Sequence, residues 1–381
     1  MEKLFDIIDS LSGEYVEFLT DICNIESKSD NKEGLDRVWE IIKSHGIQRS
    51  YDIKELILEK AGNVLSLTYN PKGEKPHACL SAHMDTVFDK GEFGYPPVKR
   101  AGDMLYGPGV IDCKGGITVS LLAIDALRRY GYNDRPVKFI LQSDEEVESV
   151  NSEGKTIEFM INEAKGGAAF FNCEGKTKGF ITTKRKGIIR LCLDIKGKAA
   201  HAGDYFEGIS AIREASYKII DLEGKSLKGG ITYNCGVIHG GTALNVVPDT
   251  CKVYIDVRIN NQEEYEFAME EVKKTAATVF VQGTSCEVLH VSHRKPMERT
   301  GANVSLFNHI NKVSRKYGFG EHKECFSNGG SDAAYTTLAG IATVDDVGPI
   351  GGKYHTKEEW CFIPSIAESA KLLAASIIEL D

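Results

Sequence analysis

The chain has 381 residues, 42% of them hydrophobic, and a formal net charge of −9 at pH 7. This length can bury one large core or two ordinary ones, and the negative charge argues against a nucleic acid or an anionic membrane as partner. No apolar run approaches the ~18–20 residues of a membrane span, and charges interrupt the apolar runs near the N-terminus, so neither a membrane anchor nor a signal peptide is expected. The ten cysteines contain no C-x-x-C pair and are expected to be reduced thiols of a cytoplasmic protein.

The first part of the chain alternates between helical and extended patterns. Residues 4–23 and 35–42 have the apolar spacing of helices, and residues 63–68 and 77–82 have that of strands. The alternation continues to about residue 182. Such an order is typical of an α/β domain.

The strand predicted at 77–82 runs directly into His83-Met84-Asp85. Residues i and i+2 of a strand point to the same side. We therefore expect Asp85 to accept a hydrogen bond from one imidazole nitrogen of His83 while the other nitrogen faces a metal. A carboxylate in this position fixes the tautomer of a metal-binding histidine and raises its basicity.

Further candidate ligands follow short apolar runs downstream. They are Asp112, Glu145, Glu146, Glu174 and His355. Because ligands of an open α/β sheet bind outside the carboxyl ends of the strands, we expect these side chains to converge with His83 at one edge. Two histidines and several carboxylates suit two divalent ions, zinc first, with manganese or cobalt also accepted by such a site.

A charge count divides the carboxylates into ligands and a non-ligand. Asp112, Glu146 and Glu174 bring three negative charges, and a bridging hydroxide would complete the balance with two divalent ions. Glu145 then remains to take a proton from the water and pass it to a leaving amine. The run Asp144-Glu145-Glu146 also fits a solvated acidic turn, but its position at the end of an apolar strand favours the catalytic interpretation.

Residues 183–295 have a different pattern, which predicts an inserted α+β sandwich with a four-stranded sheet. Strands are expected at 187–195, 231–238 and 251–258, and helices at 210–220 and 263–279. A helix at 303–317 then resumes the first pattern. Since His355 must meet His83, the first domain is expected to be discontinuous, with residues 1–182 and 296–381.

A glycine loop near the C-terminal end is a candidate for binding the carboxylate of a substrate. Gly329-Gly330-Ser331-Asp332 precedes an apolar helical run, so its backbone N–H groups could form an anion site, with Ser331 or Asp332 as helix cap. Arg258, at the end of a strand, could add a bidentate partner for a carboxylate. A structural salt bridge is the alternative for this arginine.

These motifs resemble the M20 metallopeptidase family, within it the glutamate carboxypeptidase (carboxypeptidase G2-like) branch. The matching segments are 81–86, 107–116, 143–146, 199–203, 240–248, 329–334 and 354–356. The resemblance implies a mixed-sheet, helix-flanked dizinc catalytic domain with an inserted ferredoxin-like α+β lid and dimerisation domain. It also implies roles for the residues named above. The implied metal ligands are His83, Asp112 (bridging), Glu146, Glu174 and His355, with Glu145 as general base and Asp85 as partner of His83.

The inserted domain holds two further candidates. His201 lies in a Gly/Ala-rich turn, and this pattern alone indicates an exposed turn histidine. The resemblance implies instead that His201 stabilises the oxyanion in the partner subunit of a homodimer. Asn245 follows Gly240-Gly241-Thr242, where asparagine commonly serves turns. The resemblance implies that Asn245 contacts the substrate or the transition state.

Two positions depart from the family pattern. Gly175 follows Glu174 where relatives commonly have proline, and Lys295, with Arg294 beside it, stands where the branch often places an arginine that grips the substrate carboxylate. Lysine is a point charge rather than a planar fork, so release of a C-terminal glutamate does not follow from the resemblance.

The expected activity is metal-dependent hydrolysis of an amide bond next to a free carboxylate. The product would be a C-terminal amino acid released from a small peptide or an N-acyl amino acid, through a metal-bridging hydroxide and a glutamate base. An N-acyl amino acid deacylase or a dipeptidase on the same site is an alternative, and a catalytically silent metal-binding relative is another. The presence of Glu145 together with every candidate ligand argues against the silent relative.

Overall fold

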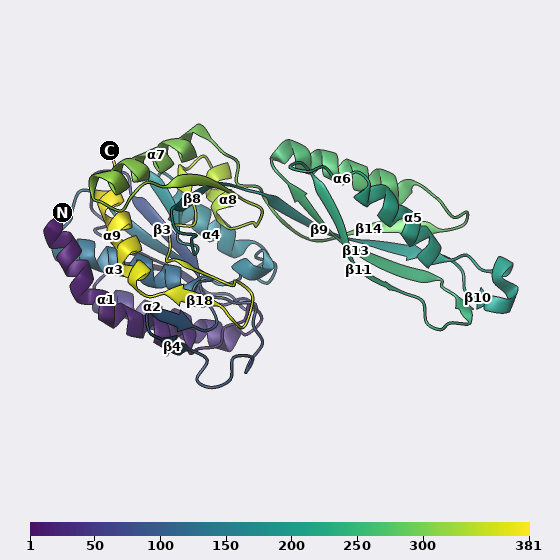
Figure 1. Cartoon of the computed structure of the whole chain (residues 1–381), viewed down its shortest axis with the longest axis horizontal. Coiled ribbons are helices and arrows are strands. Elements are labelled where there is room, and N and C mark those ends of the chain that lie inside the picture. The colour runs from purple at the N-terminus through teal and green to yellow at the C-terminus, as the bar shows by residue number, and fades with distance from the viewer. The chain divides into compact units, whose positions relative to one another are not determined.

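The computed structural model describes residues 1–381, and the chain divides into two units (Figure 1). The first unit consists of Met1–Thr183, Arg299–Phe326 and Tyr335–Asp381, and the second of Lys184–Glu298 and Ser327–Ala334. The glycine loop therefore packs with the second unit, whereas the sequence boundaries assigned it to the first domain.

The first unit is built on a six-stranded mixed sheet, as expected for the fold class. Its strand order is β1-β2-β6-β3-β7-β16. The strands are β1 (Asp52–Leu56), β2 (Val64–Tyr69), β6 (Val137–Gln142), β3 (Ala78–His83), β7 (Ala169–Asn172) and β16 (Thr343–Val344). β3 runs parallel to both β6 and β7, whereas β1 and β2 are antiparallel to their neighbours. The carboxyl ends of β3, β6 and β7 consequently meet at one edge.

Helices flank this sheet. They are α1 (Glu2–Cys23), α2 (Lys32–Gln48), α3 (Lys114–Tyr130), α4 (Lys155–Ala164), α7 (Gly301–Lys316), α8 (Ala333–Leu338) and α9 (Pro364–Ile378). Asn31 caps the start of α2 by accepting a hydrogen bond from the backbone N–H of Gly34. Gly131, with φ of 86°, ends α3 in the left-handed conformation. None of the helices combines the length and the apolar character needed to cross a bilayer.

Two smaller sheets contain further segments of the chain. β17 (Gly351–Gly352), β18 (Trp360–Phe362), β5 (Met104–Tyr106) and β4 (Lys99–Ala101) form a four-stranded sheet in that order. β8 (Phe180–Arg185) pairs with β15 (Lys323–Ser327). The four-stranded sheet is important for the site because it joins the segment that precedes Asp112 to the segment that carries His355.

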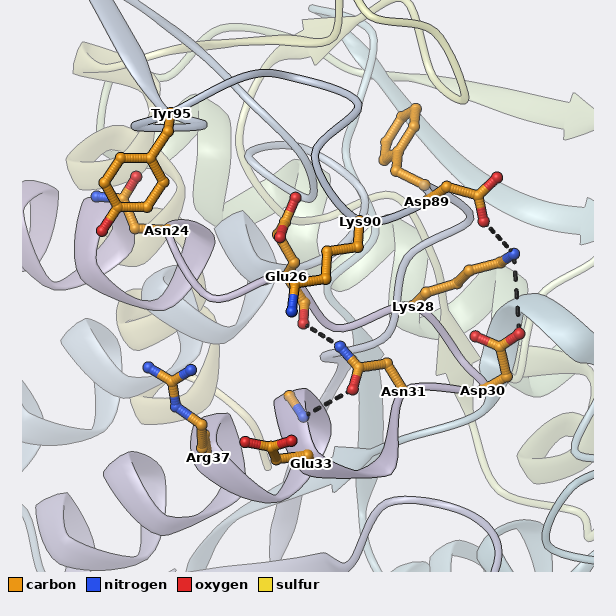
Figure 2. Close-up of a pocket in the computed structure, with 12 residues that line it drawn as sticks. Asn24, Glu26, Lys28, Asp30, Asn31, Glu33, Arg37, Asp89, Lys90 and Tyr95 are labelled. Atoms are coloured by element: carbon orange, nitrogen blue, oxygen red, sulfur yellow. Dashed lines mark hydrogen bonds and ion pairs between the residues drawn. The ribbon is translucent and has the colours of Figure 1, made fainter.

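The loop 84–98 that follows β3 lies against the connection between α1 and α2. Ser29 Oγ donates a hydrogen bond of 2.7 Å to Asp85 Oδ2. Lys28 Nζ pairs with Asp89 at 2.6 Å, beside a polar cavity of about 450 Å³ (Figure 2). These contacts fix the position of Asp85 directly after the strand end.

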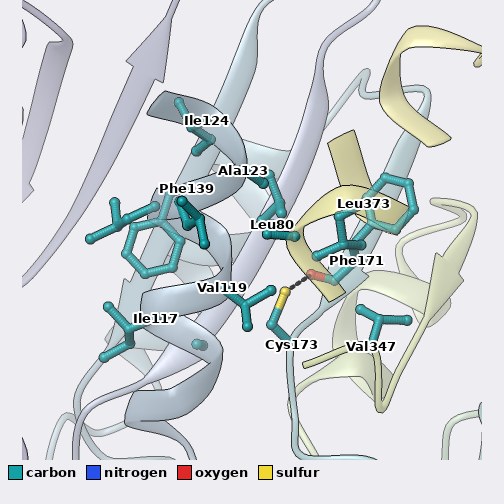
Figure 3. Packing of buried hydrophobic residues seen from close by; sticks show 14 of the residues in the cluster. Leu80, Ile117, Val119, Ala123, Ile124, Phe139, Phe171, Cys173, Val347 and Leu373 are labelled. Carbon is teal, nitrogen blue, oxygen red and sulfur yellow. Dashed lines mark hydrogen bonds between the residues drawn. The ribbon is translucent and has the colours of Figure 1, made fainter. Parts of the chain in front are cut away.

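The core of the first unit centres on α3. All residues of α3 from 114 to 127 are buried, because the helix packs against β3 on one side and against α1 and α9 on others. Val119 and Ala123 of α3 lie near Leu80 of β3 and Leu373 of α9 in this core (Figure 3). The start of α3, directly after Asp112, is consequently held in place by tertiary packing.

The second unit has the predicted order of strand, helix, two strands, helix and strand. Its elements are β9 (Gly187–Lys196), α5 (Ala211–Glu223), β11 (Thr232–Gly240), β13 (Thr250–Ile259), α6 (Gln262–Ala277) and β14 (Ser285–Arg294). The four strands form an antiparallel sheet in the order β11-β13-β9-β14. Burial alternates along β13, which matches a sheet with one covered face. The short strands β10 (Ala200–His201) and β12 (Val246–Val247) pair beside the 3-10 helix η2 (Ala202–Glu207).

Candidate metal centre

His83 is the last residue of β3 and is almost completely buried. Its Nδ1 lies 3.0 Å from the backbone carbonyl oxygen of Asp85 and 3.3 Å from Asp85 Oδ1. Asp85 also accepts the backbone N–H groups of Glu145 (3.2 Å) and Glu146 (3.0 Å). The carboxylate of Asp85 thus connects the ring of His83 to the acidic turn after β6, and it leaves Nε2 of His83 facing the other carboxylates.

The carboxylate of Asp112 lies between two imidazoles. Its Oδ1 is 3.0 Å from Nε2 of His83, and its Oδ2 is 3.2 Å from Nε2 of His355. Each imidazole also faces a second carboxylate. Glu174 Oε1 lies 3.6 Å from His83 Nε2, and Glu146 Oε2 lies 3.1 Å from His355 Nε2. The structure thus brings all five candidate ligands together as two halves that share Asp112.

The electrostatics of this cluster fit bound cations. Burial and the neighbouring Asp112 raise the pKa of Glu146 to about 8, and burial also raises the pKa of Glu174 well above its usual value. Hydrogen bonds to Asp112 and Glu146 raise the pKa of His355 to about 11. These shifts favour bound protons on Glu146, Glu174 and His355, because several negative charges are held close together in a buried site. Two divalent ions can take the place of these protons, so the donor set and its burial fit a two-metal site.

The two halves differ in their access to solvent. The side chain of His83 is 2% exposed, whereas that of His355 is 54% exposed. His355 lies in the loop between β17 and β18 and has a left-handed backbone conformation, with φ of 58°. A small molecule approaching from solvent would thus meet the His355 half of the cluster first.

Glu145 lies in a short 3-10 helix, η1 (Glu145–Val147), directly after β6. Its Oε2 is 4.0 Å from His83 Nε2, farther than the nearest oxygens of Asp112 (3.0 Å) and Glu174 (3.6 Å). Asp144 is fully buried and accepts hydrogen bonds from Ser152 N (2.8 Å) and Thr156 Oγ1 (2.9 Å). The acidic turn is therefore a buried, hydrogen-bonded element at the cluster rather than a solvated run of charges.

Glu359 is a residue of the centre that the sequence did not reveal. Its fully buried Oε1 accepts the backbone N–H groups of Ile111 (3.0 Å) and Asp112 (3.2 Å). Glu359 belongs to the segment that carries His355, so one carboxylate ties the backbone of Asp112 to that segment. In the sequence it stands in Lys357-Glu358-Glu359, which has the appearance of a surface charge run. Only its position directly before the apolar segment of β18 could have signalled a different role.

His201 and Asn245 meet at one end of the second unit. The antiparallel pair of β10 and β12 brings them together, and the carbonyl of Asn245 accepts the backbone N–H of Ala202 at 2.8 Å. The ring of His201 accepts the N–H of Gly203 through Nδ1 at 3.1 Å, which leaves Nε2 directed elsewhere. Both residues are exposed, as are their neighbours Phe206 and Leu244.

Arg258 forms the salt bridge that was the alternative to substrate binding. Its guanidinium donates to both oxygens of Asp256 and, through Nη1, to the carbonyl of Asn328 at 3.1 Å. A bidentate pair of this kind occupies the fork that a substrate carboxylate would need. Arg258 therefore anchors the beginning of the glycine loop.

The glycine loop is packed against a different arginine. A side chain at Gly330 would come within 2.6 Å of Arg294 Cδ, and Arg294 Nη1 lies 3.6 Å from Asp332 Oδ1. Lys295, by contrast, donates to Gln262 at 3.2 Å. Arg294, and not its neighbour Lys295, is therefore the positively charged residue that lies beside the glycine loop. The backbone N–H of Gly329 donates a hydrogen bond to Ser327 Oγ. Ser331 Oγ accepts the backbone N–H of Ala333 at the start of α8, which has only six residues.

A helix-flanked mixed sheet at whose strand ends two histidines and a group of carboxylates come together, with one histidine supplied by a neighbouring loop, suits a metal-dependent hydrolase. The chain belongs to peptidase family M20/M25/M40, whose model matches residues 79–379. It is accordingly a hydrolytic metallopeptidase with a candidate metal site.

Individual relatives agree with this assignment. The chain is 26% identical to carboxypeptidase G2 of Pseudomonas sp. (strain RS-16) over 378 residues, which cover 96% of the chain and 89% of that protein. Its fold is similar to that of a tripeptidase of Staphylococcus aureus (TM-score 0.79, 22% identity, 97% of each chain covered). It is also similar to the Bacillus subtilis YXEP protein, a dinuclear metal-binding peptidase of the M20 family (TM-score 0.70, 17% identity, 98% and 99% covered).

Proposed function

We propose that the protein hydrolyses the amide bond next to a free carboxylate and releases a C-terminal amino acid from a small peptide or an N-acyl amino acid. The observation that carries this proposal is the position of Asp112, whose two oxygens lie 3.0 Å and 3.2 Å from the imidazoles of His83 and His355. A carboxylate between two histidines can bridge a pair of ions. The similarity to carboxypeptidase G2 favours the C-terminal position of the released residue.

In this proposal the five clustered side chains hold two divalent ions. His83 and Glu174 would hold one, His355 and Glu146 would hold the other, and Asp112, which lies beside both histidines, would serve both ions. Zinc suits these donors, and manganese and cobalt are the alternatives. When bound, the ions polarise the substrate carbonyl and lower the pKa of water.

The protein's own groups move the proton and orient the ligands. Glu145, beside the cluster, accepts the proton of the attacking water and delivers it to the amine that leaves. Asp85 holds Nδ1 of His83 at 3.3 Å and thereby directs Nε2 to the ions. His201 donates a hydrogen bond to the oxyanion, an interaction that is worth roughly 2.7–4 kcal/mol when one such donor is removed.

We further propose that the protein is a homodimer formed through the second unit, so that His201 serves the catalytic unit of the partner. Support comes from apolar side chains left open on that unit. Ile220 of α5 is 70% exposed, and Val237 and Ile238 on the edge strand β11 are 47% and 48% exposed. An unpaired edge beside an apolar helix face is a surface that natural proteins usually cover.

Recognition of the substrate is assigned to Asn245 and to the loop Gly329, Gly330 and Ser331. Arg258 enters this proposal as the residue that holds Asn328, and thereby the loop, in position. The positive charge beside the loop comes from Arg294, which is 3% exposed. We expect these groups to contact the substrate carboxylate directly. The substrate panel described next tests this expectation.

The test is a panel of N-acylated amino acids and small peptides, assayed with the metal-free protein after addition of zinc, manganese or cobalt. Release of C-terminal residues from both peptides and N-acyl substrates supports the proposal, and the preferred residue identifies the side-chain specificity. Cleavage of N-acyl amino acids alone, or of dipeptides alone, would instead assign the deacylase or dipeptidase alternative. Absence of metal-dependent hydrolysis across the panel would refute all three, and Glu145→Ala serves as the inactive control.

A further inference from the structure

Cys113 belongs to a second group of donors inside the metal centre. The sulfur of Cys113, a nitrogen of His83 and an oxygen of Glu174 all lie within 4.8 Å of one another, and all three residues are buried. Cys113 Sγ is also 3.3 Å from the carbonyl oxygen of Cys173, the residue before Glu174. Thiolate sulfur, imidazole nitrogen and carboxylate oxygen are all ligands that zinc accepts in proteins, so this group has the donor types and the spacing of a single-ion site.

The other half of the centre has no sulfur. The second group of donors that lie within 4.8 Å of one another is His83, Asp112 and Glu146, and the histidine nearest Glu146 is His355. The two ion positions of the proposed function are therefore unlike in chemistry as well as in exposure. The sulfur lies on the buried side, with His83, and the solvent-exposed imidazole lies on the other.

We propose that Cys113 binds, as a thiolate, the ion held by His83 and Glu174, and that this sulfur makes the buried position selective for zinc. The inference rests on the proposed two-metal function, because it assigns a further ligand to one of those two ions. Soft thiolate favours zinc over manganese and magnesium, which prefer oxygen donors. The position held by His355 and Glu146, with only nitrogen and oxygen donors, would accept a wider range of divalent ions.

Both the charges and the proton are accounted for when the thiolate binds the ion. As the bond from sulfur to the ion forms, the S–H bond of Cys113 breaks, its hydrogen bond to Cys173 is lost, and the proton leaves to solvent. The carboxylates of Asp112, Glu146 and Glu174 together with one thiolate carry four negative charges, which match two divalent ions. In this arrangement the thiolate takes the place of the bridging hydroxide in the charge balance, and the attacking water stays neutral until Glu145 accepts its proton. No oxidant or other reactant takes part in this step.

Cys173 provides a matched control. It is buried near Cys113, but its sulfur accepts a hydrogen bond from Ser120 at 3.2 Å and lies 3.6 Å from the carbonyl of Phe171, within the core (Figure 3). Its sulfur is not one of the donors that cluster with His83. Removing either thiol therefore deletes a similar buried volume, whereas only the loss of Cys113 should change the metal.

The experiment is zinc X-ray absorption on the full chain loaded with two equivalents of zinc, with cobalt absorption spectra as a second measurement. Wild type and Cys173→Ala are expected to show about one sulfur for every two zinc ions, at about 2.3 Å, and a near-ultraviolet band from sulfur to cobalt. Cys113→Ala is expected to lose both signals and to bind the first zinc at least about tenfold more weakly, the size of effect known for groups that support a metal site.

Two results would overturn the inference. One is a wild-type protein that holds two zinc ions with only nitrogen and oxygen neighbours, and this measurement needs no variant to fold. The other is a sulfur signal that persists in Cys113→Ala. A wild-type protein that binds none of zinc, manganese and cobalt would instead refute the proposed function, so the two failures are distinguishable.

Discussion

Glu145 and Glu146 are neighbours in one short turn, yet their carboxylates have different partners. Glu146 Oε2 lies 3.1 Å from His355, whereas Glu145 Oε2 lies 4.0 Å from His83. The backbone N–H groups of both residues are held by Asp85, which fixes the turn so that one side chain can bind an ion while the other remains beside it. At the scale of single residues, this difference of position is the basis for proposing Glu146 as a ligand and Glu145 as the base.

The first prediction follows from that difference. Glu145→Ala is expected to retain two bound ions and to lower kcat by roughly 10²-fold or more, because only proton transfer is removed. Glu146→Ala is expected to weaken binding of one ion, because a ligand is lost. Metal content after dialysis, measured beside kcat, separates the two effects. Near wild-type turnover of Glu145→Ala would show that the two roles are assigned the wrong way round.

Glu359 supports a second prediction at the same scale. Glu359→Ala leaves the buried N–H groups of Ile111 and Asp112 without their acceptor, so the backbone around Asp112 should shift and metal affinity should fall by about 10-fold or more. Glu359→Gln keeps an acceptor oxygen and is expected to bind metal much more tightly than Glu359→Ala. Competition with a chromogenic chelator measures the affinities.

The neighbouring Glu358 is the control for this measurement. Its side chain is 76% exposed, so Glu358→Ala is expected to leave metal affinity unchanged. Equal metal affinity of Glu359→Ala and the wild type would contradict a positioning role for Glu359.

At the scale of elements, a buried carboxylate on α3 joins three helices and a loop. Asp125 accepts hydrogen bonds from Tyr15 of α1 at 2.6 Å and from Tyr51, and it pairs with Arg49 after α2. Burial alone would raise the pKa of Asp125, but its hydrogen bonds, with His45 first, hold the pKa below its usual value. The pair of Asp125 with Arg49 therefore contributes to stability in the ionised form of the carboxylate.

The third prediction concerns this cluster. Asp125→Asn is expected to lower the free energy of unfolding by about 1–3 kcal/mol at neutral pH, because the partly buried Arg49 loses its pair with Asp125 and keeps only the weaker pair with Glu14. A carboxyl whose folded pKa is depressed stabilises the protein above its unfolded pKa and loses this effect as pH falls. The difference between wild type and variant should therefore be constant above about pH 5 and shrink below about pH 4. Urea unfolding at several pH values measures it, and a difference that grows on acidification would contradict the assignment.

Periodicity located the long helices and strands named in the sequence analysis, but not short strands such as β4 and β5, the C-terminal helix α9, or the packing that builds the site. The strand predicted at 77–82 is β3 (Ala78–His83), and the two early helices were also located, because each has an apolar pattern of one period. β14 had no predicted bounds, since its alternation is broken by a register shift between His290 and Ser292. Contacts between distant segments, such as Glu359 with Asp112 and Gly330 with Arg294, leave no trace in local sequence.

At the scale of the whole molecule, the two units divide the chemistry between them. All five proposed metal ligands and Glu145 belong to the first unit, whereas His201 and Asn245 belong to the second. A group that is proposed to stabilise the oxyanion must therefore reach the ions either from a partner or by closure of the second unit within one chain. The homodimer proposed above favours the partner, and this choice can be tested without determining the arrangement of the units.

The last prediction is that two inactive variants complement each other. In a hybrid dimer of Glu145→Ala and His201→Ala chains, the catalytic unit of the His201→Ala chain keeps Glu145 and receives His201 from the other chain. With random exchange half of the dimers are hybrid and one of their two sites is intact, so about a quarter of wild-type activity should return. Mixing Glu145→Ala with the doubly substituted chain is the control and should restore none. Hybrid dimers that form, as shown by differently tagged chains, but regain no activity would exclude a histidine shared across the interface and leave closure within one chain.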